Sequence, residues 1–162
     1  MPVVTYPQRY RCKQGAPDIF IGDEAASQVF NYGGFVILDT DGNIAQAIAS
    51  GSNYLSTDTP ILGMALMDAS GTSLTDIAVL LAEDNVEFLL PLAAADSTAK
   101  TQVGVGYQLE HTAESQYSVD VDDTGSPVVI VTEIAPDDPA GTARGWVWVR
   151  FIRAEVDFAE ST

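Results

Sequence analysis

The single histidine, His111, is the first residue to consider for catalysis. It lies in the polar stretch QLEHTAESQY, with Glu110 and Glu114 close to it in sequence. A histidine that acts as a general base needs a nucleophile and an orienting carboxylate, and no serine stands in a Gly-x-Ser-x-Gly turn. Cys12 is the only cysteine and has no set of histidines around it that would make it a nucleophile. We therefore expect a solvent-exposed His111 and a protein that is not an enzyme.

Two aspartate-rich stretches could hold a metal ion. DVDDTG places Asp120 and Asp122 at the first and third positions of a calcium loop. The fifth and twelfth positions, which should supply ligands, are Thr124 and Val131. In DTDGN, residues 39–43, the glycine comes too early for such a loop. Short Asp and Asn side chains often hydrogen-bond their own backbone, so we predict two hairpin turns and neither a metal nor a cofactor.

The charge of the chain disfavours several classes of partner. There are 23 acidic residues against 7 Lys and Arg, a formal net charge of −16. The negative electrostatic field of such a chain repels phosphate backbones and anionic lipids, so nucleic acid is not an expected partner. The longest apolar run, Phe88 to Ala95, contains a proline and is far shorter than the ~20 residues that cross a bilayer, so no membrane contact is expected. The first residues lack the apolar centre of a signal peptide, and a lone cysteine cannot close an internal disulfide, so we expect synthesis in a host cytoplasm.

The elements that must position these residues are predicted to be strands. Residues 35–48, FVILDTDGNIAQAI, contain two apolar runs around an Asp-Gly turn, which is the pattern of a β-hairpin. Residues 117–121 alternate between apolar and polar side chains, and residues 146–151 place two tryptophans on one face and three apolar side chains on the other. Short strands separated by turns in a chain of 162 residues predict an all-β fold, a single small β-barrel or sandwich-like domain.

The stretch from Pro60 to Asp84 predicts two further strands. Residues 61–67 form a short apolar run bounded by a proline and an aspartate, which favours a strand over a buried helix. Residues 77–82 are apolar at nearly every position, as in a strand that is buried on both faces. Gly63 stands where a strand would normally carry a bulky side chain. It therefore predicts a bend or a close approach of two backbones.

Several segments occur along the chain in an order that carries a resemblance. They are PILGMALMDASG (60–71), DIAVLLA (76–82), VEF (86–88), TQVG (101–104) with Tyr107, YSVDVDD (117–123) and GWVWV (145–149). This ordered set resembles the capsid decoration proteins of tailed bacteriophages, also called cement or head-stabilising proteins. Proteins of this family are small and β-rich, and they sit on the outside of the icosahedral head, often as trimers. The resemblance covers residues 61–152 and implies a structural virion protein on the outer capsid surface, with the major capsid protein and a homotrimer of its own copies as partners.

The N-terminal segment differs from the rest of the chain in its charge. Three cations precede the first acidic residue, Asp18, and three prolines disfavour a helix. We expect residues 1–17 to form an extended arm and residues 18–162 to form the β-barrel-like domain. Contacts with the capsid or with a neighbouring copy would then be made by Tyr6, Arg9, Tyr10, Arg11 and Lys13. The alternatives are a frayed terminus or a first strand of the domain.

The two tryptophans, Trp146 and Trp148, share one face of a predicted strand. Apolar residues flank both of them, which favours burial in the core or in an interface. An exposed pair could instead stack on sugar rings. A carbohydrate-binding or receptor-binding β-module on the virion surface is therefore the alternative function.

Overall fold

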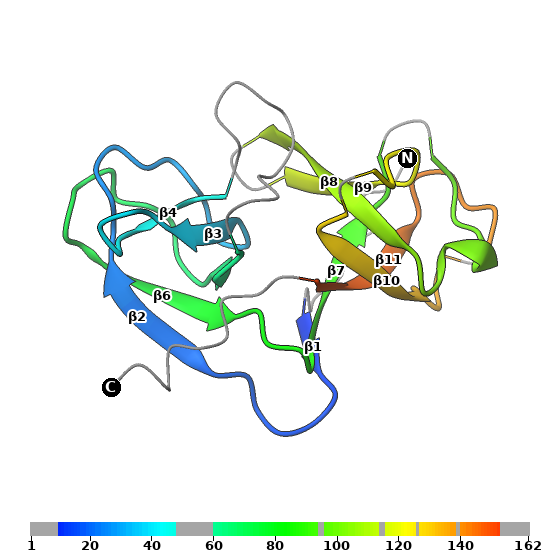
Figure 1. Cartoon of the computed structure of the whole chain (residues 1–162), viewed down its shortest axis with the longest axis horizontal. Coiled ribbons are helices and arrows are strands. Elements are labelled where there is room, and N and C mark those ends of the chain that lie inside the picture. The colour runs from blue at the N-terminus through cyan, green and yellow to red at the C-terminus, as the bar shows by residue number, and fades with distance from the viewer. Residues whose placement is uncertain are drawn as a thin grey trace.

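The computed structural model has the predicted all-β fold, arranged as two antiparallel sheets (Figure 1). It describes residues 10–47, 60–93, 96–113, 116–125, 127–138 and 140–152. Within these ranges, the only helical element is a 3₁₀ turn at Lys100–Gln102. No helix in the described ranges has the length and apolar character needed to cross a membrane.

The six-stranded sheet has the strand order β1-β7-β11-β10-β8-β9. Its strands are β1 (Tyr10–Cys12), β7 (Val86–Pro91), β11 (Trp146–Phe151), β10 (Val129–Ile134), β8 (Gly106–Ala113) and β9 (Gln116–Asp120). Alternation along β11 buries Val147, Val149 and Phe151 and leaves Trp146 and Trp148 on the opposite face. The predicted division of this strand into two faces is confirmed.

The five-stranded sheet has the strand order β2-β6-β5-β3-β4. Its strands are β2 (Ile19–Asp23), β6 (Asp76–Leu81), β5 (Gly63–Ala65), β3 (Phe35–Leu38) and β4 (Ile44–Gln46). β3 and β4 form the predicted hairpin. In its turn, the Oδ1 atom of Asp39 accepts hydrogen bonds from the backbone N–H groups of Asp41 (2.9 Å) and Asn43 (2.8 Å), while Gly42 has φ +82°. The prediction that this aspartate serves the turn is confirmed.

The main core lies between the two sheets and is built around Phe35 of β3. Its ring meets those of Phe88, Tyr117 and Phe151 edge-on, with centroids 5.2, 5.0 and 4.9 Å away. All three partners belong to the six-stranded sheet, so the fold is sandwich-like and the alternative of a closed barrel is wrong. The two sheets lie side by side in Figure 1 with β7 following directly from β6.

A second apolar cluster lies on the other face of the five-stranded sheet, around Phe30. Next to it, Glu24 is fully buried, at 0% exposure. The carboxylate of Glu24 accepts hydrogen bonds from the backbone N–H and hydroxyl of Ser70 and from the N–H of Gly71, at 2.7–3.0 Å. A buried carboxylate with this many donors is satisfied, and it fixes the connection between β5 and β6 onto the end of β2.

The predicted boundary between arm and domain is wrong for the described part of the N-terminal segment. Tyr10–Cys12 is strand β1, which pairs antiparallel with β7. Tyr10 and Cys12 pack against the main core, while Arg11 points to the opposite face. The alternative of a first strand of the domain therefore holds for these residues. The sequence feature that indicates this strand is the alternation of apolar and cationic residues from Tyr10 to Lys13. The arm residues Tyr6 and Arg9 lie outside the described residues.

The close backbone approach predicted at Gly63 is confirmed, and it leads to a test. A Cβ atom at this position would overlap the carbonyl oxygen of Leu80 on β6. We expect Gly63→Ala to lower the free energy of unfolding by about 3 kcal/mol, because the two strands must separate locally. Gly125→Ala is the matched control, since the nearest atom to its Cβ would be 3.6 Å away. Urea titrations of both variants measure the difference, and equal stability of the two would contradict the assignment.

Candidate interaction surface

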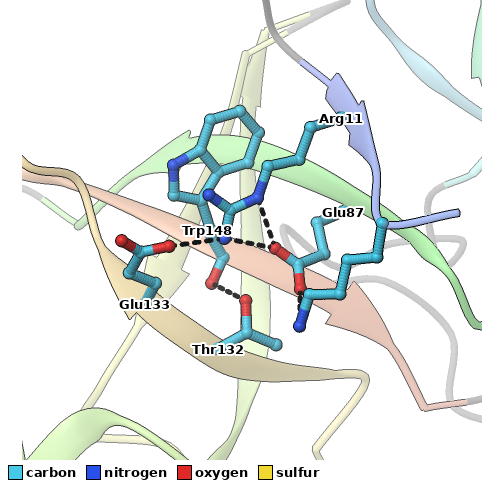
Figure 2. Close-up of polar contacts among 6 residues, drawn as sticks. Arg11, Glu87, Thr132, Glu133 and Trp148 are labelled. Atoms are coloured by element: carbon cyan, nitrogen blue, oxygen red, sulfur yellow. Dashed lines mark hydrogen bonds and ion pairs between the residues drawn. The ribbon is translucent and has the colours of Figure 1, made fainter.

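The outward-facing side of the six-stranded sheet contains a buried carboxylate, Glu87 of β7. Phe88 enters the core, so alternation turns Glu87 to the opposite face, where its side chain is only 1% exposed. Arg11 of β1 is its direct partner across the two strands. Figure 2 shows the two side chains reaching toward each other over the sheet.

Both oxygens of Glu87 are held by cations. Oε2 accepts from Nε of Arg11 at 2.7 Å and lies 2.6 Å from Nη2, while Oε1 lies 2.6 Å from Nζ of Lys13. Burial alone would raise the pKa of Glu87, but the hydrogen bonds from Lys13 and Arg11 outweigh it and lower the pKa. Most of the desolvation cost of this carboxylate is therefore offset by the two cations of β1 and the residue that follows it.

The guanidinium of Arg11 also reaches β10 and β11. Nη2 donates to Glu133 at 2.7 Å, and Cζ lies 4.2 Å from the ring centroid of Trp148 (Figure 2). Burial by itself would lower the pKa of Arg11, but its hydrogen bonds with Glu133 and Glu87 outweigh this effect and raise the pKa above its ordinary value. Because Glu133 is half exposed, we attribute most of the stabilisation to Glu87 and to the cation–π contact. We name this set, Arg11, Lys13, Glu87, Glu133 and Trp148, the Arg11 clamp.

An open groove of about 370 Å³ adjoins the Arg11 clamp at Glu133. Its other lining residues are Lys100, Val103, Thr132, Ile134, Ala135, Pro136 and Ala140. The lining is mostly apolar, with one cation and one carboxylate, and Val103 is 45% exposed. We call the clamp, the groove, Trp146 and Arg150 together the outer face.

Four of the residues predicted for the site, Arg11, Lys13, Trp146 and Trp148, lie on the outer face. Trp146 and Trp148 are half-buried there, so neither is a core residue. One face of the Trp148 ring is covered by Arg11, and the backbone N–H of Trp146 donates to Asp138 at 3.0 Å. Whether these residues contact a partner remains a prediction.

Sequence reasoning missed Glu87 and Glu133. The available signal was a single carboxylate within the otherwise apolar strand VEFLLP. A buried acid requires a cation nearby, and Arg11 and Lys13 alternate with Tyr10 and Cys12 in the N-terminal segment. What no local pattern contained was the pairing of that segment with β7.

The prediction of a solvent-exposed His111 is wrong. It is half-buried on β8, directly opposite Tyr117 of β9, with the two ring centroids 4.9 Å apart. Its Nε2 atom lies 3.2 Å from Nε2 of Gln46, which belongs to the other sheet. The hydroxyl of Tyr117 donates to the carbonyl oxygen of Phe35 at 3.2 Å, and burial raises the pKa of Tyr117. His111 therefore belongs to the junction between the sheets.

The second aspartate-rich stretch also serves its own backbone. Oδ1 of Asp120 accepts from the N–H of Asp122 at 3.0 Å, and Oδ1 of Asp123 accepts from the N–H of Gly125 at 3.1 Å. This confirms the predicted turn. In the part of the chain that the structure describes, His, Cys, Asp and Glu side chains form no group of three or more suited to a metal ion.

Comparison with known proteins adds no family to these observations. No protein-family model matches the chain, and no curated protein matches it significantly. The outer face and the ordered sequence segments described above are therefore the basis for inferring a function.

Removal of Arg11 alone should destabilise the fold more than removal of Arg11 and Glu87 together. We expect Arg11→Met to lower the free energy of unfolding by about 3 kcal/mol, because Glu87 stays buried with one fewer cation. Arg11→Met combined with Glu87→Leu should recover much of that loss. Arg150→Met, on the same face but outside the clamp, is the control and should change stability by less than about 0.5 kcal/mol. Urea denaturation measures all three, and a double variant less stable than Arg11→Met would contradict the clamp.

Stability should also pass through a maximum as pH falls. The lowered pKa of Glu87 stabilises the fold above the ordinary value of 4.5, and this contribution is lost as pH falls through the lower folded pKa. Burial and the neighbouring Asp18 raise the pKa of Glu83, so its charged form costs stability at pH 7, and that cost disappears as pH falls toward 4.5. We expect the melting temperature to rise and then fall on acidification. Glu83→Gln should weaken the rise and Glu87→Gln should weaken the fall; unchanged profiles would refute these assignments.

Proposed function

We propose that this protein is a structural virion protein that binds the outside of a phage icosahedral head and stabilises the capsid lattice. The ordered segments between residues 61 and 152 support a decoration protein, and the sandwich-like fold is compatible with one. The proposed partners are the major capsid protein and further copies of the chain as a homotrimer. The outer face of the six-stranded sheet is the surface proposed to dock on the capsid.

The composition of the outer face is the observation that carries this proposal. Two half-buried tryptophans and a stacked arginine lie beside a mostly apolar groove, and aromatic residues and arginine are enriched in protein interfaces. Four of the seven cations also belong to this face, namely Arg11, Lys13, Lys100 and Arg150. In a chain of net charge −16, such a face meets less repulsion from an acidic partner than the rest of the surface would.

The proposed mechanism of stabilisation is multivalent. A symmetric trimer on a symmetric lattice would contact several capsid subunits at once. After the first contact forms, the remaining contacts are effectively intramolecular, so weak individual contacts add to a strong attachment. The trimer would then resist separation of the capsid subunits that it bridges.

Carbohydrate or receptor binding on the virion is the second candidate, and the geometry favours it less. A sugar ring needs a free aromatic face, and one face of Trp148 is already covered by Arg11 at 4.2 Å. Glycan binding would therefore compete with a contact of the clamp. A protein partner can use the same aromatic and arginine surface without displacing it.

Rebinding to native heads tests the proposal. Heads of the virus that encodes the chain would be stripped of it and incubated with purified protein, and occupancy would be measured by mass spectrometry and cryo-electron microscopy. We expect wild type to rebind and to raise the heat resistance of the heads. Val103→Asp in the groove should weaken rebinding at least about tenfold, because it adds a charge to an apolar contact.

Val29→Asp is the matched control for this experiment. Val29 is also an exposed valine, at 59%, but it lies in the connection between β2 and β3 of the other sheet. Equal weakening by both substitutions would show that added charge alone accounts for the loss. Failure of wild type to bind heads, together with specific binding to a glycan array, would replace the proposal with the second candidate.

A further inference from the structure

β2 is an outermost strand of the five-stranded sheet, and its open edge is available for pairing. Among the residues that the structure describes, β2 is hydrogen-bonded along its length only to β6. Beyond its end, the backbone N–H of Ala25 donates to the carbonyl of Ile44, which brings the chain against β4 at that one point. The edge from Ile19 to Gly22 is therefore the exposed part.

The register of β2 on β6 decides which backbone groups face outward. The N–H of Leu81 donates to the carbonyl of Asp18, and the N–H of Glu24 donates to the carbonyl of Thr75. Alternation in an antiparallel pair then directs the N–H and C=O groups of Ile19 and Ile21 away from β6. Within the described ranges, these groups have no backbone partner on that side.

The side chains of the same two residues are exposed to an unusual degree for isoleucine. Ile19 is 58% and Ile21 is 65% exposed. Natural proteins commonly protect an open edge with lysine, proline or a bulge, whereas this edge presents two β-branched apolar residues. Such a strand is suited to receive another strand through main-chain hydrogen bonds and apolar contacts.

The charge around the edge selects the kind of strand it can receive. Asp18 and Asp23 flank the isoleucines, Asp76 lies opposite Asp23, and Glu83 hydrogen-bonds with Asp18. Pairing with the β2 strand of another copy would bring these carboxylates close to the same carboxylates of that copy, and the like charges would repel. The edge therefore favours a segment that carries cations and no acid.

Residues 2–9 of this chain have that character. The sequence PVVTYPQR contains an arginine and no acid, and its proline-free stretch Val3–Tyr6 consists of residues that favour strands. The C-terminal residues 153–162 contain three acids and fit the edge less well. The eight residues 2–9 would reach about 27 Å from β1 if fully extended, which is far enough to contact a neighbouring copy.

We infer that residues 2–9 of one copy add as a strand to the open edge of β2 in another copy, with Val3–Tyr6 beside Ile19–Gly22. Because each copy supplies one donor segment and one acceptor edge, the contact is head-to-tail, and a threefold rotation between copies would close it into the proposed trimer. The inference deepens the proposed homotrimer and does not depend on what that trimer binds.

Two variants that each lack one half of the contact test this inference. Deletion of residues 1–9 removes the donor segment, and Ile19→Lys with Ile21→Lys blocks the acceptor edge. Each should weaken self-association at least about thirtyfold in sedimentation and native mass spectrometry while the melting temperature stays unchanged. The lysines reduce the net negative charge, so added repulsion would not explain the loss. Val103→Lys, an exposed valine of the outer face, is the control and should self-associate normally.

Mixing the two defective variants provides the decisive measurement. The truncated chain keeps the acceptor edge and the lysine variant keeps the donor segment, so an equimolar mixture should form a one-to-one heterodimer that neither forms alone. A monomeric full-length chain, unaltered association of either variant, or the absence of the heterodimer would each overturn the inference. Val103→Asp separates this result from capsid docking, because it should still self-associate normally while its rebinding to heads is weakened.

Discussion

The contact of Phe35 with three aromatic rings joins the two sheets of this protein. Phe35 is the member of the five-stranded sheet that meets Phe88, Tyr117 and Phe151 of the other. Edge-on packing of aromatic rings fixes both separation and orientation, because the ring edge of one side chain must meet the face of another. The positions of the outer face on one sheet and the β2 edge on the other both follow from this junction.

A second constraint is the burial of Glu87. A carboxylate without water is costly unless cations neutralise it, and two of them come from a strand of only three residues and the residue that follows it. β1 contributes few backbone hydrogen bonds, so its register depends strongly on these side chains. The same arrangement brings Arg11 over Trp148 and gives the outer face its combination of aromatic and cationic groups.

The net charge of −16 shapes every association proposed for this chain. Copies repel one another over most of their surface, so contact is favoured where cations collect or where an acid-free segment meets acids. The outer face satisfies the first condition, and the β2 edge paired with residues 2–9 satisfies the second. Since these surfaces lie on different sheets, capsid docking and self-association can occur together.

Local patterns in the sequence determined much of this fold. The Asp-Gly turn determined the β3–β4 hairpin, alternation determined the two faces of residues 146–151, and Gly63 determined a close backbone approach, because each depends only on neighbouring residues or on a missing side chain. Only the tertiary structure decided whether Tyr10–Cys12 is an arm or a strand. Its partner Glu87 is 76 residues from Arg11, and neither segment by itself contains the information that the other will be its neighbour. For the same reason, the burial of His111 and the covering of Trp148 followed from the packing of distant strands, which no local pattern specifies.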